Sequence, residues 1–251
     1  MVLFFLIFFQ LFNVNDTNKR KVPEIIVQIQ SITIDKFIFD VEAANCPRLD
    51  NGKLDTDNSQ AYDLGGMVID NDGNDYKRIS LVNKDVFFGM RDAMKEAYFA
   101  NKIPDYMRSI WGKEKTVVDT WQMWRIVNDI LKEYDIHTII GHNVWFDINT
   151  LNATMRYQTK SRKRYFFPYD IKVVDTMKLA HKTICKDPEY IRFCEENNYM
   201  TNHPVPQPRK TAEVLWRFLS QDNNFEEEHT GLADVEIERR IFAECLRREH
   251  F

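Results

Sequence analysis

The sequence predicts an α/β fold with one mixed sheet of five strands and helices packed on both of its faces. Three observations predict it. The strand-like stretches 61–69 and 75–82 flank Asn71-Asp72-Gly73-Asn74, which is a strong hairpin signal. An apolar stretch at 36–42 precedes them, so three meandering strands open the domain. Helical patterns then alternate with two more apolar stretches, at 136–140 and 170–174.

Apolar residues at helical spacing define the remaining elements. They predict helices at 85–99, at 117–134, from about 147, at 187–200, at 211–219 and at 231–248. Asp175-Thr176 has the composition of a helix start, with Asp175 as the capping residue. We therefore expect one domain over 34–251, with a small helical insert at about 183–208, and an extension over 1–33 that lies outside the fold.

Composition restricts the class of protein. The chain has 251 residues, of which 44% are hydrophobic and 13% aromatic, so it can bury a core and is not a disordered protein. Its formal net charge of −4 excludes a uniformly cationic nucleic-acid binder but not a nucleic-acid enzyme. The four cysteines show no C-x-x-C spacing, which favours a reduced, cytoplasmic protein without a zinc site.

Residues 1–12, MVLFFLIFFQLF, are apolar apart from Gln10. A membrane-spanning helix needs about 20 such residues, and a secretory signal needs a basic start that is missing here. Three interpretations remain open: a segment that makes a weak membrane contact, a segment that docks a partner, and translated sequence upstream of the true start.

Two acids end the first predicted strand. Asp40 and Glu42 are two residues apart, so strand alternation places both carboxylates on one face. Burying unpaired carboxylates is costly, and a divalent cation would remove that cost. The alternative is that the strand and its acids have reached the surface together.

Two later segments also carry acids at the ends of elements. Asp147 follows the predicted strand 136–140 and lies near a helix start, where the helix dipole alone would favour an acid. Asp234 falls inside the predicted helix 231–248 beside its apolar stripe, and His229 precedes it by five residues. His229 must belong to the preceding loop if both side chains are to face one cleft.

Together, the three segments resemble the motifs of the DEDDh branch of the DnaQ-like 3′–5′ exonuclease family. The matching stretches are Asp40-Val41-Glu42, His142-Asn143-Val144-Trp145-Phe146-Asp147 and His229-Thr230-Gly231-Leu232-Ala233-Asp234. Val173-Val174-Asp175-Thr176 is similar to the family's penultimate strand and helix start, so the resemblance covers about residues 35 to 248. The chain departs from the family at Ala43-Ala44, where threonines are common, and at Gly231, where alanine is usual.

The resemblance implies a ribonuclease H-like fold and a metal-dependent 3′–5′ exonuclease that releases nucleoside monophosphates from single-stranded DNA in proofreading or repair. It implies that Asp40, Glu42, Asp147 and Asp234 hold two Mg²⁺ or Mn²⁺ ions, whose hard character suits carboxylate oxygens. His229 would be the general base that takes the proton from the attacking water. Asn143, Val41 and Ala43 would contact the terminal nucleotide, although Asn143 could equally fix the turn it lies in. His142 is expected to form structural hydrogen bonds.

The partners implied are a single-stranded 3′ end, DNA in preference to RNA, and a DNA polymerase. An RNA-trimming exonuclease uses the same ligands and stays an alternative. A non-catalytic nucleic-acid or polymerase-binding module predicts the loss of a ligand, and none is lost. The basic run Lys160-Ser161-Arg162-Lys163-Arg164, with aromatic residues behind it, would either grip a phosphate backbone or form a solvated turn.

Overall fold

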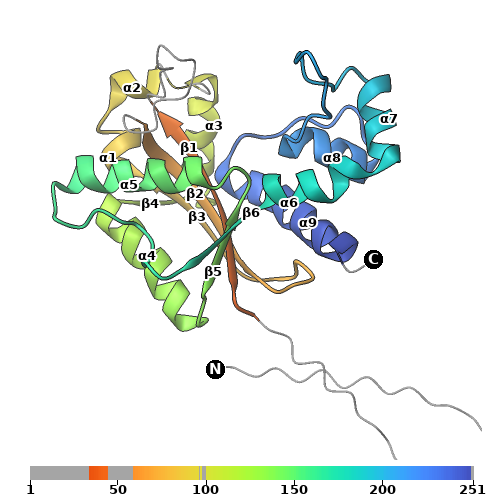
Figure 1. Ribbon diagram of the computed structural model, residues 1–251. Coiled ribbons are helices and arrows are strands. Elements are labelled where there is room, and N and C mark those ends of the chain that lie inside the picture. The colour runs from red at the N-terminus through yellow and green to blue at the C-terminus, as the bar shows by residue number, and fades with distance from the viewer. Residues whose placement is uncertain (1–33, 45–58, 96, 98–99, 250–251) are drawn as a thin grey trace, which may run out of the picture.

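The computed structural model describes residues 34–44, 59–95, 97 and 100–249. A six-stranded sheet runs through it in the order β4-β3-β2-β1-β5-β6 (Figure 1). The strands are β1 Lys36–Ala44, β2 Gln60–Ile69, β3 Asp75–Asn83, β4 Thr116–Val118, β5 Thr138–Gly141 and β6 Lys172–Asp175. Strands β1, β2 and β3 form an antiparallel meander, and the pairs β1–β5, β5–β6 and β3–β4 are parallel.

The α/β class and the mixed sheet are confirmed, and β1, β2, β3, β5 and β6 have the order and directions of the expected ribonuclease H-like sheet. The sixth strand, β4, corrects the prediction of five. It adds to the free edge of β3, and the sequence had placed two of its residues in the following helix. That helix starts later because Asp119 caps it: its carboxylate accepts from Gln122 N–H, and the Gln122 side chain accepts from Asp119 N–H.

Helices cover both faces of the sheet (Figure 1). They are α1 Lys84–Phe87, α2 Arg91–Lys95, α3 Ile103–Trp111, α4 Thr120–Glu133, α5 Trp145–Thr159, α6 Thr176–Lys182, α7 Pro188–Glu196, α8 Ala212–Ser220 and α9 Gly231–Glu249, with short 3₁₀ turns at Ala100–Lys102 and Ile184–Lys186. Within the described part of the chain, no helix is both long and apolar enough to cross a membrane.

The predicted helix at 85–99 is wrong in its extent, because the segment forms two short helices. The amides of Phe88 and Gly89 both donate to the carbonyl of Lys84, and this ends α1 after a single turn. The following turn and α3 were not predicted. The predicted helix start at Asp175 is confirmed: its carboxylate caps α6 by accepting from the amides of Met177 and Lys178.

Strand β1 is the centre of the sheet, and its side chains alternate between two cores. Phe37, Phe39 and Val41 pack with residues of α4 and α5 on one face, whereas Ile38 packs with residues of α9 on the other. Full burial of such a side chain stabilises the fold by about 1.5–3 kcal/mol. The alternation leaves Asp40 and Glu42 on the same face as Ile38, the face that α9 covers.

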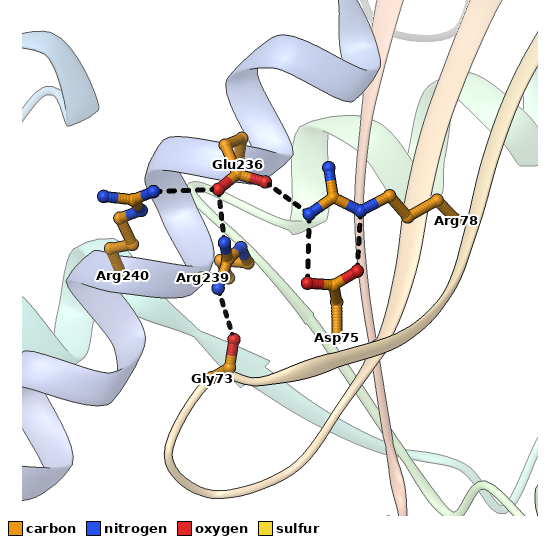
Figure 2. Close-up of polar contacts among 6 residues, drawn as sticks. All are labelled: Gly73, Asp75, Arg78, Glu236, Arg239 and Arg240. Carbon is orange, nitrogen blue, oxygen red and sulfur yellow. Dashed lines mark hydrogen bonds and ion pairs between the residues drawn. The ribbon is translucent and has the colours of Figure 1, made fainter.

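Helix α9 lies against the sheet at two places. At its first residue the contact is backbone on backbone: a Cβ atom added to Gly65 of β2 would lie 2.0 Å from the carbonyl carbon of Gly231. Further along, Glu236 forms ion pairs with Arg78 of β3 and with Arg239 and Arg240 of its own helix (Figure 2). The first contact sets how closely the helix approaches, and the second joins it to the β2–β3 hairpin.

Several predictions fall on residues outside the described ranges. They include the extension 1–33 with its membrane contact, and Cys46, one of the four cysteines; these stay predictions, as do the domain boundaries. The other three cysteines, Cys185, Cys194 and Cys245, are buried and free. The helix expected within the insert 183–208 is present as α7.

Candidate active site

The predicted acids converge where β1 extends beyond its parallel neighbour. Strand β5 pairs only with Lys36 to Ile38, so the later part of β1 is open on that side. Helix α5 starts there, after the turn that follows β5, and α9 starts on the opposite side, against β2. The gap beside the carboxyl end of a central strand, at the point where the strand order reverses, is the usual place for a site in open α/β sheets.

Each acid is positioned by a different element. Asp40 and Glu42 point the same way from β1, opposite Gly65 and Asp63 of β2. Asp147 is buried in the first turn of α5, close enough to Asp40 of β1 for their charges to interact. Asp234 is buried in the first turn of α9, and its amide donates to the carbonyl of Thr230.

A fifth acid, Glu238, joins them and was not predicted. It lies one turn after Asp234 on α9, is buried, and accepts a 3.2 Å hydrogen bond from the backbone amide of His142. Because residues four apart share a helix face, the spacing from Asp234 was the signal that could have found it. We call Asp40, Glu42, Asp147, Asp234 and Glu238 the acidic cluster.

The acidic cluster is electrostatically unfavourable for ionised carboxylates. Burial, followed by the charges of Asp40 and Asp234, raises the pKa of Glu42 to about 10. Burial, followed by the charge of Asp40, raises the pKa of Asp234 to about 9. Burial is also the main cause that raises the pKa of Asp40, Asp147 and Glu238 well above the ordinary range. Facing carboxylates of this kind are stable together only with protons or cations between them.

The residues fit a divalent cation. One oxygen each of Glu42 and Asp234 and one ring nitrogen of His229 lie within 4.8 Å of one another. In the described part of the chain, Asp234 Oδ1 is buried without a hydrogen-bond partner, although a buried carboxylate oxygen ordinarily has one. A donor set of carboxylate oxygens suits Mg²⁺ or Mn²⁺.

His229 lies in the loop before α9, as expected, and its backbone has a left-handed conformation with φ 48°. Burial, followed by the charge of Lys102, lowers the pKa of its imidazole. Its Nδ1 atom is 3.8 Å from an oxygen of Glu227, too far for a hydrogen bond. The imidazole is therefore neutral near pH 7 and can accept a proton.

His142 forms structural hydrogen bonds, as predicted. Its Nε2 atom lies 2.7 Å from the carbonyl oxygen of Lys210 and must donate to it, so the neutral ring accepts at Nδ1 from the hydroxyl of Thr176, 3.0 Å away. Burial lowers the pKa of the ring and keeps it neutral. His142 thus ties the turn after β5 to α6 and to the segment before α8.

The three predicted substrate contacts lie in different surroundings. The side chain of Val41 is buried in the core beside α5, because strand alternation turns it away from Asp40 and Glu42, so a contact with the nucleotide would have to come from its backbone and stays a prediction. Ala43 is half-buried at the end of β1. Asn143 is exposed, and its backbone is left-handed with φ 62°. Its backbone N–H donates to Asp175 Oδ1, so the residue fixes its turn through its backbone. Substrate contacts by Asn143 and Ala43 stay predictions.

A buried polar network beside the acidic cluster was missed entirely. The carboxylate of Asp63 accepts from Lys115 Nζ at 2.8 Å, from the Tyr106 hydroxyl at 2.8 Å and from the Gly231 amide at 3.0 Å. Lys115 also donates to Ser80 Oγ. The network holds the first residue of α9, between His229 and Asp234. Lys115 and Asp63 are 52 residues apart in the chain, so no local pattern indicates the pair.

Comparison with known proteins finds no matching family model and no matching curated protein. Solved structures that are similar to this chain include exonuclease I, from a study titled "The structure of exonuclease I suggests how processivity is achieved", with a TM-score of 0.46 and 13% identity. The match covers 82% of this chain and 40% of that one, so this chain spans well under half the length of exonuclease I.

Proposed function

We propose that this protein is a metal-dependent 3′–5′ exonuclease that hydrolyses the terminal phosphodiester bond of single-stranded DNA. The observation that carries the proposal is the convergence of Asp40, Glu42, Asp147 and Asp234, with His229 beside two of them. These are the five residues that match the exonuclease motifs, and they come from one strand, β1, from the two helices α5 and α9, and from the loop before α9. Their proximity, although they are far apart in the sequence, supports the proposal.

In this proposal each residue has one task. The carboxylates of Asp40, Glu42, Asp147 and Asp234 hold two divalent cations, which stabilise the negative charge that develops on the attacking and leaving oxygens. His229, neutral near pH 7, accepts the proton of the attacking water. Asn143, exposed at the turn after β5, orients the terminal nucleotide.

The test uses the purified full-length chain and strands of DNA and RNA labelled at the 5′ end. We expect shortening from the 3′ end with release of mononucleotides in Mg²⁺ or Mn²⁺ and none in EDTA. A preference for RNA over DNA would contradict the proposed substrate, and metal-independent cleavage would contradict the mechanism.

Two variants separate this site from a contaminating nuclease. Asp147→Asn and His229→Ala are each expected to lower turnover by at least about a hundredfold, since general bases alone contribute about 10²–10⁴-fold. Asp129→Asn, an exposed acid on α4, is the matched control and should retain full activity. If either site variant is as active as the control while remaining folded, the assignment of the site is wrong.

A further inference from the structure

The segment from Ile148 to Tyr169 has a charge opposite to that of the whole chain. It contains no acidic residue and five basic ones, whereas the chain carries a formal net charge of −4. The basic residues are Arg156, Lys160, Arg162, Lys163 and Arg164. Within the part of the chain that the structure describes, Lys160, Arg162 and Arg164 are exposed and take part in no ion pair. Their charge is therefore available to an anionic partner.

Exposed aromatic rings lie among these charges. The exposed fractions are 61% for Tyr157, 59% for Tyr165 and 92% for Tyr169. The rings of Tyr165 and Tyr169 meet edge to face, with centroids 6.3 Å apart. Tyrosine combines an apolar face with a polar end, and exposed rings that gather in one patch mark an interaction site more often than scattered ones do. Basic residues with exposed rings match the backbone and the bases of a single nucleic-acid strand.

The ring pair is held in place by its neighbours. Phe166 and Phe167, between the two tyrosines, are buried in the core. The amide of Phe166 donates to Asn152 Oδ1 at 2.8 Å, and its carbonyl accepts from Asn128 Nδ2 at 3.1 Å. Tyr165 and Tyr169 are thus presented by an anchored segment, which lowers the entropic cost of binding.

Helix α5 leads from the candidate active site, at Asp147 in its first turn, to the basic residues that follow its last residue (Figure 1). It begins beside Asp147 and has 15 residues, so it is about 22 Å long. Trp145, Asn149 and Arg156 are exposed along one side of the helix, with the half-buried Asn152 between the last two. This stripe contains no carboxylate, and it leads from the site to the basic residues at the far end of the helix.

We propose that this surface binds the part of a single DNA strand that lies upstream of the 3′ end held in the active site. We call it the α5 surface and define it by Arg156, Tyr157, Lys160, Arg162, Arg164, Tyr165 and Tyr169. The inference rests on the proposed function, because the strand's 3′ end must lie at the acidic cluster. A stacked strand rises about 3.4 Å per nucleotide, so the 22 Å of α5 correspond to about six or seven nucleotides.

Binding is measured by fluorescence anisotropy in EDTA, with the full-length chain and labelled single strands of about 16 and about four nucleotides, the shorter one too short to reach the α5 surface. The triple variant Lys160→Gln/Arg162→Gln/Arg164→Gln should bind the long strand about tenfold more weakly and the short strand unchanged. The slope of log affinity against log salt should fall by about 2, because each lost phosphate contact contributes about 0.7.

A second variant tests the rings. Tyr165→Ala/Tyr169→Ala should weaken binding of a long thymidine strand about tenfold, because each stacked base contributes substantially to affinity. Its salt slope should stay as in the unmodified chain. Both properties together distinguish stacking from a general loss of charge.

The matched control is Lys182→Gln/Lys186→Gln/Arg192→Gln, which removes the same charge from exposed positions on α6, on the 3₁₀ turn that follows it and on α7. Equal weakening by both triple variants would show a net-charge effect and overturn the proposal. So would unchanged binding of the long strand by the first triple variant, or binding of polyglutamate as tight as that of DNA. If the α5 surface binds DNA as expected but no metal-dependent cleavage occurs, the proposed function fails and the binding surface stands.

Discussion

Raising the pH in the presence of EDTA is expected to destabilise the folded protein, because the acidic cluster then holds protons that the unfolded chain has released. The pKa values of Glu42 and Asp234 are raised to about 10 and about 9, whereas in the unfolded chain both groups ionise near pH 4. A group whose folded pKa is raised stabilises the fold fully only below its unfolded pKa. Its contribution is lost as the pH rises toward the folded pKa.

In the window from pH 7 to 8 the acidic cluster dominates the dependence of stability on pH. Burial lowers the pKa values of His142 and His229, so both imidazoles are neutral in the folded and unfolded states above pH 7. The pKa of Glu227 is raised to about 7, so that group loses its proton in the lower part of the window and adds a smaller loss of the same sign. Each proton retained only by the folded state changes the free energy of unfolding by about 1.4 kcal/mol per pH unit, so Glu42 and Asp234 together contribute about 2.7 kcal/mol. The raised pKa values of Asp40, Asp147 and Glu238 add to this loss in the same direction.

Thermal unfolding followed by circular dichroism measures the change. For a chain of this size the apo protein should lose at least about 5 °C in Tm between pH 7 and pH 8. The double variant Glu42→Gln/Asp234→Asn, whose neutral amides cannot titrate, should lose less, because the share of these two groups is removed. Asp129→Asn should keep the full dependence on pH.

Excess Mn²⁺ should reverse the trend, because the cations bind the ionised carboxylates and favour the folded state more strongly as the pH rises. The rise in Tm on adding Mn²⁺ should therefore be larger at pH 8 than at pH 7. An apo Tm that is constant or rises from pH 7 to 8 would refute the reasoning, since the carboxyls would then be ionised in the folded state without cations.

Three further predictions concern the first turns of α9. Gly231→Ala places a Cβ atom 2.5 Å from the backbone nitrogen of Gly65. We expect the free energy of unfolding in urea to fall by about 1–3 kcal/mol, and Mn²⁺ binding measured by calorimetry to weaken. Unchanged values would mean that the helix can move away from the sheet freely. Lys115→Met leaves the buried carboxylate of Asp63 without its cationic partner and should lower the free energy of unfolding in urea by about 3–5 kcal/mol. Adding Asp63→Asn should restore part of this stability, and no restoration would argue against the ion pair as the cause. Glu236→Gln removes half-exposed ion pairs and should cost about 1 kcal/mol or less, an effect that high salt should reduce; a loss as large as that of Lys115→Met would contradict this ranking.

The sequence predicted the elements whose signal lies within them. Strand β1, the β2–β3 hairpin and helix α9 each carry enough periodic apolar residues to be recognised alone. The alternation that places Asp40 and Glu42 on one face also places Val41 on the other. The local pattern therefore leaves only the backbone of Val41 for the substrate contact that the family resemblance implies.

The elements that were missed depend on contacts distant in the chain. Strand β4 has three residues and exists because it pairs with the edge of β3. The charge of Lys115 is buried because it forms an ion pair with the buried carboxylate of Asp63 on β2. Glu238 is buried because its side of α9 packs against the sheet. Such facts follow from the assembled fold and not from any window of sequence.

The contact between Gly65 and Gly231 has a consequence for related chains. Peptide atoms alone set the distance between α9 and the sheet at this point, and two positions far apart in the sequence share that space. A larger residue at one of them would lift the helix, and with it a carboxylate of the site, by an amount no rotamer change could absorb. In an alignment of homologues, we expect the two columns to stay small together, with alanine tolerated in one only where the strand has bent to receive it.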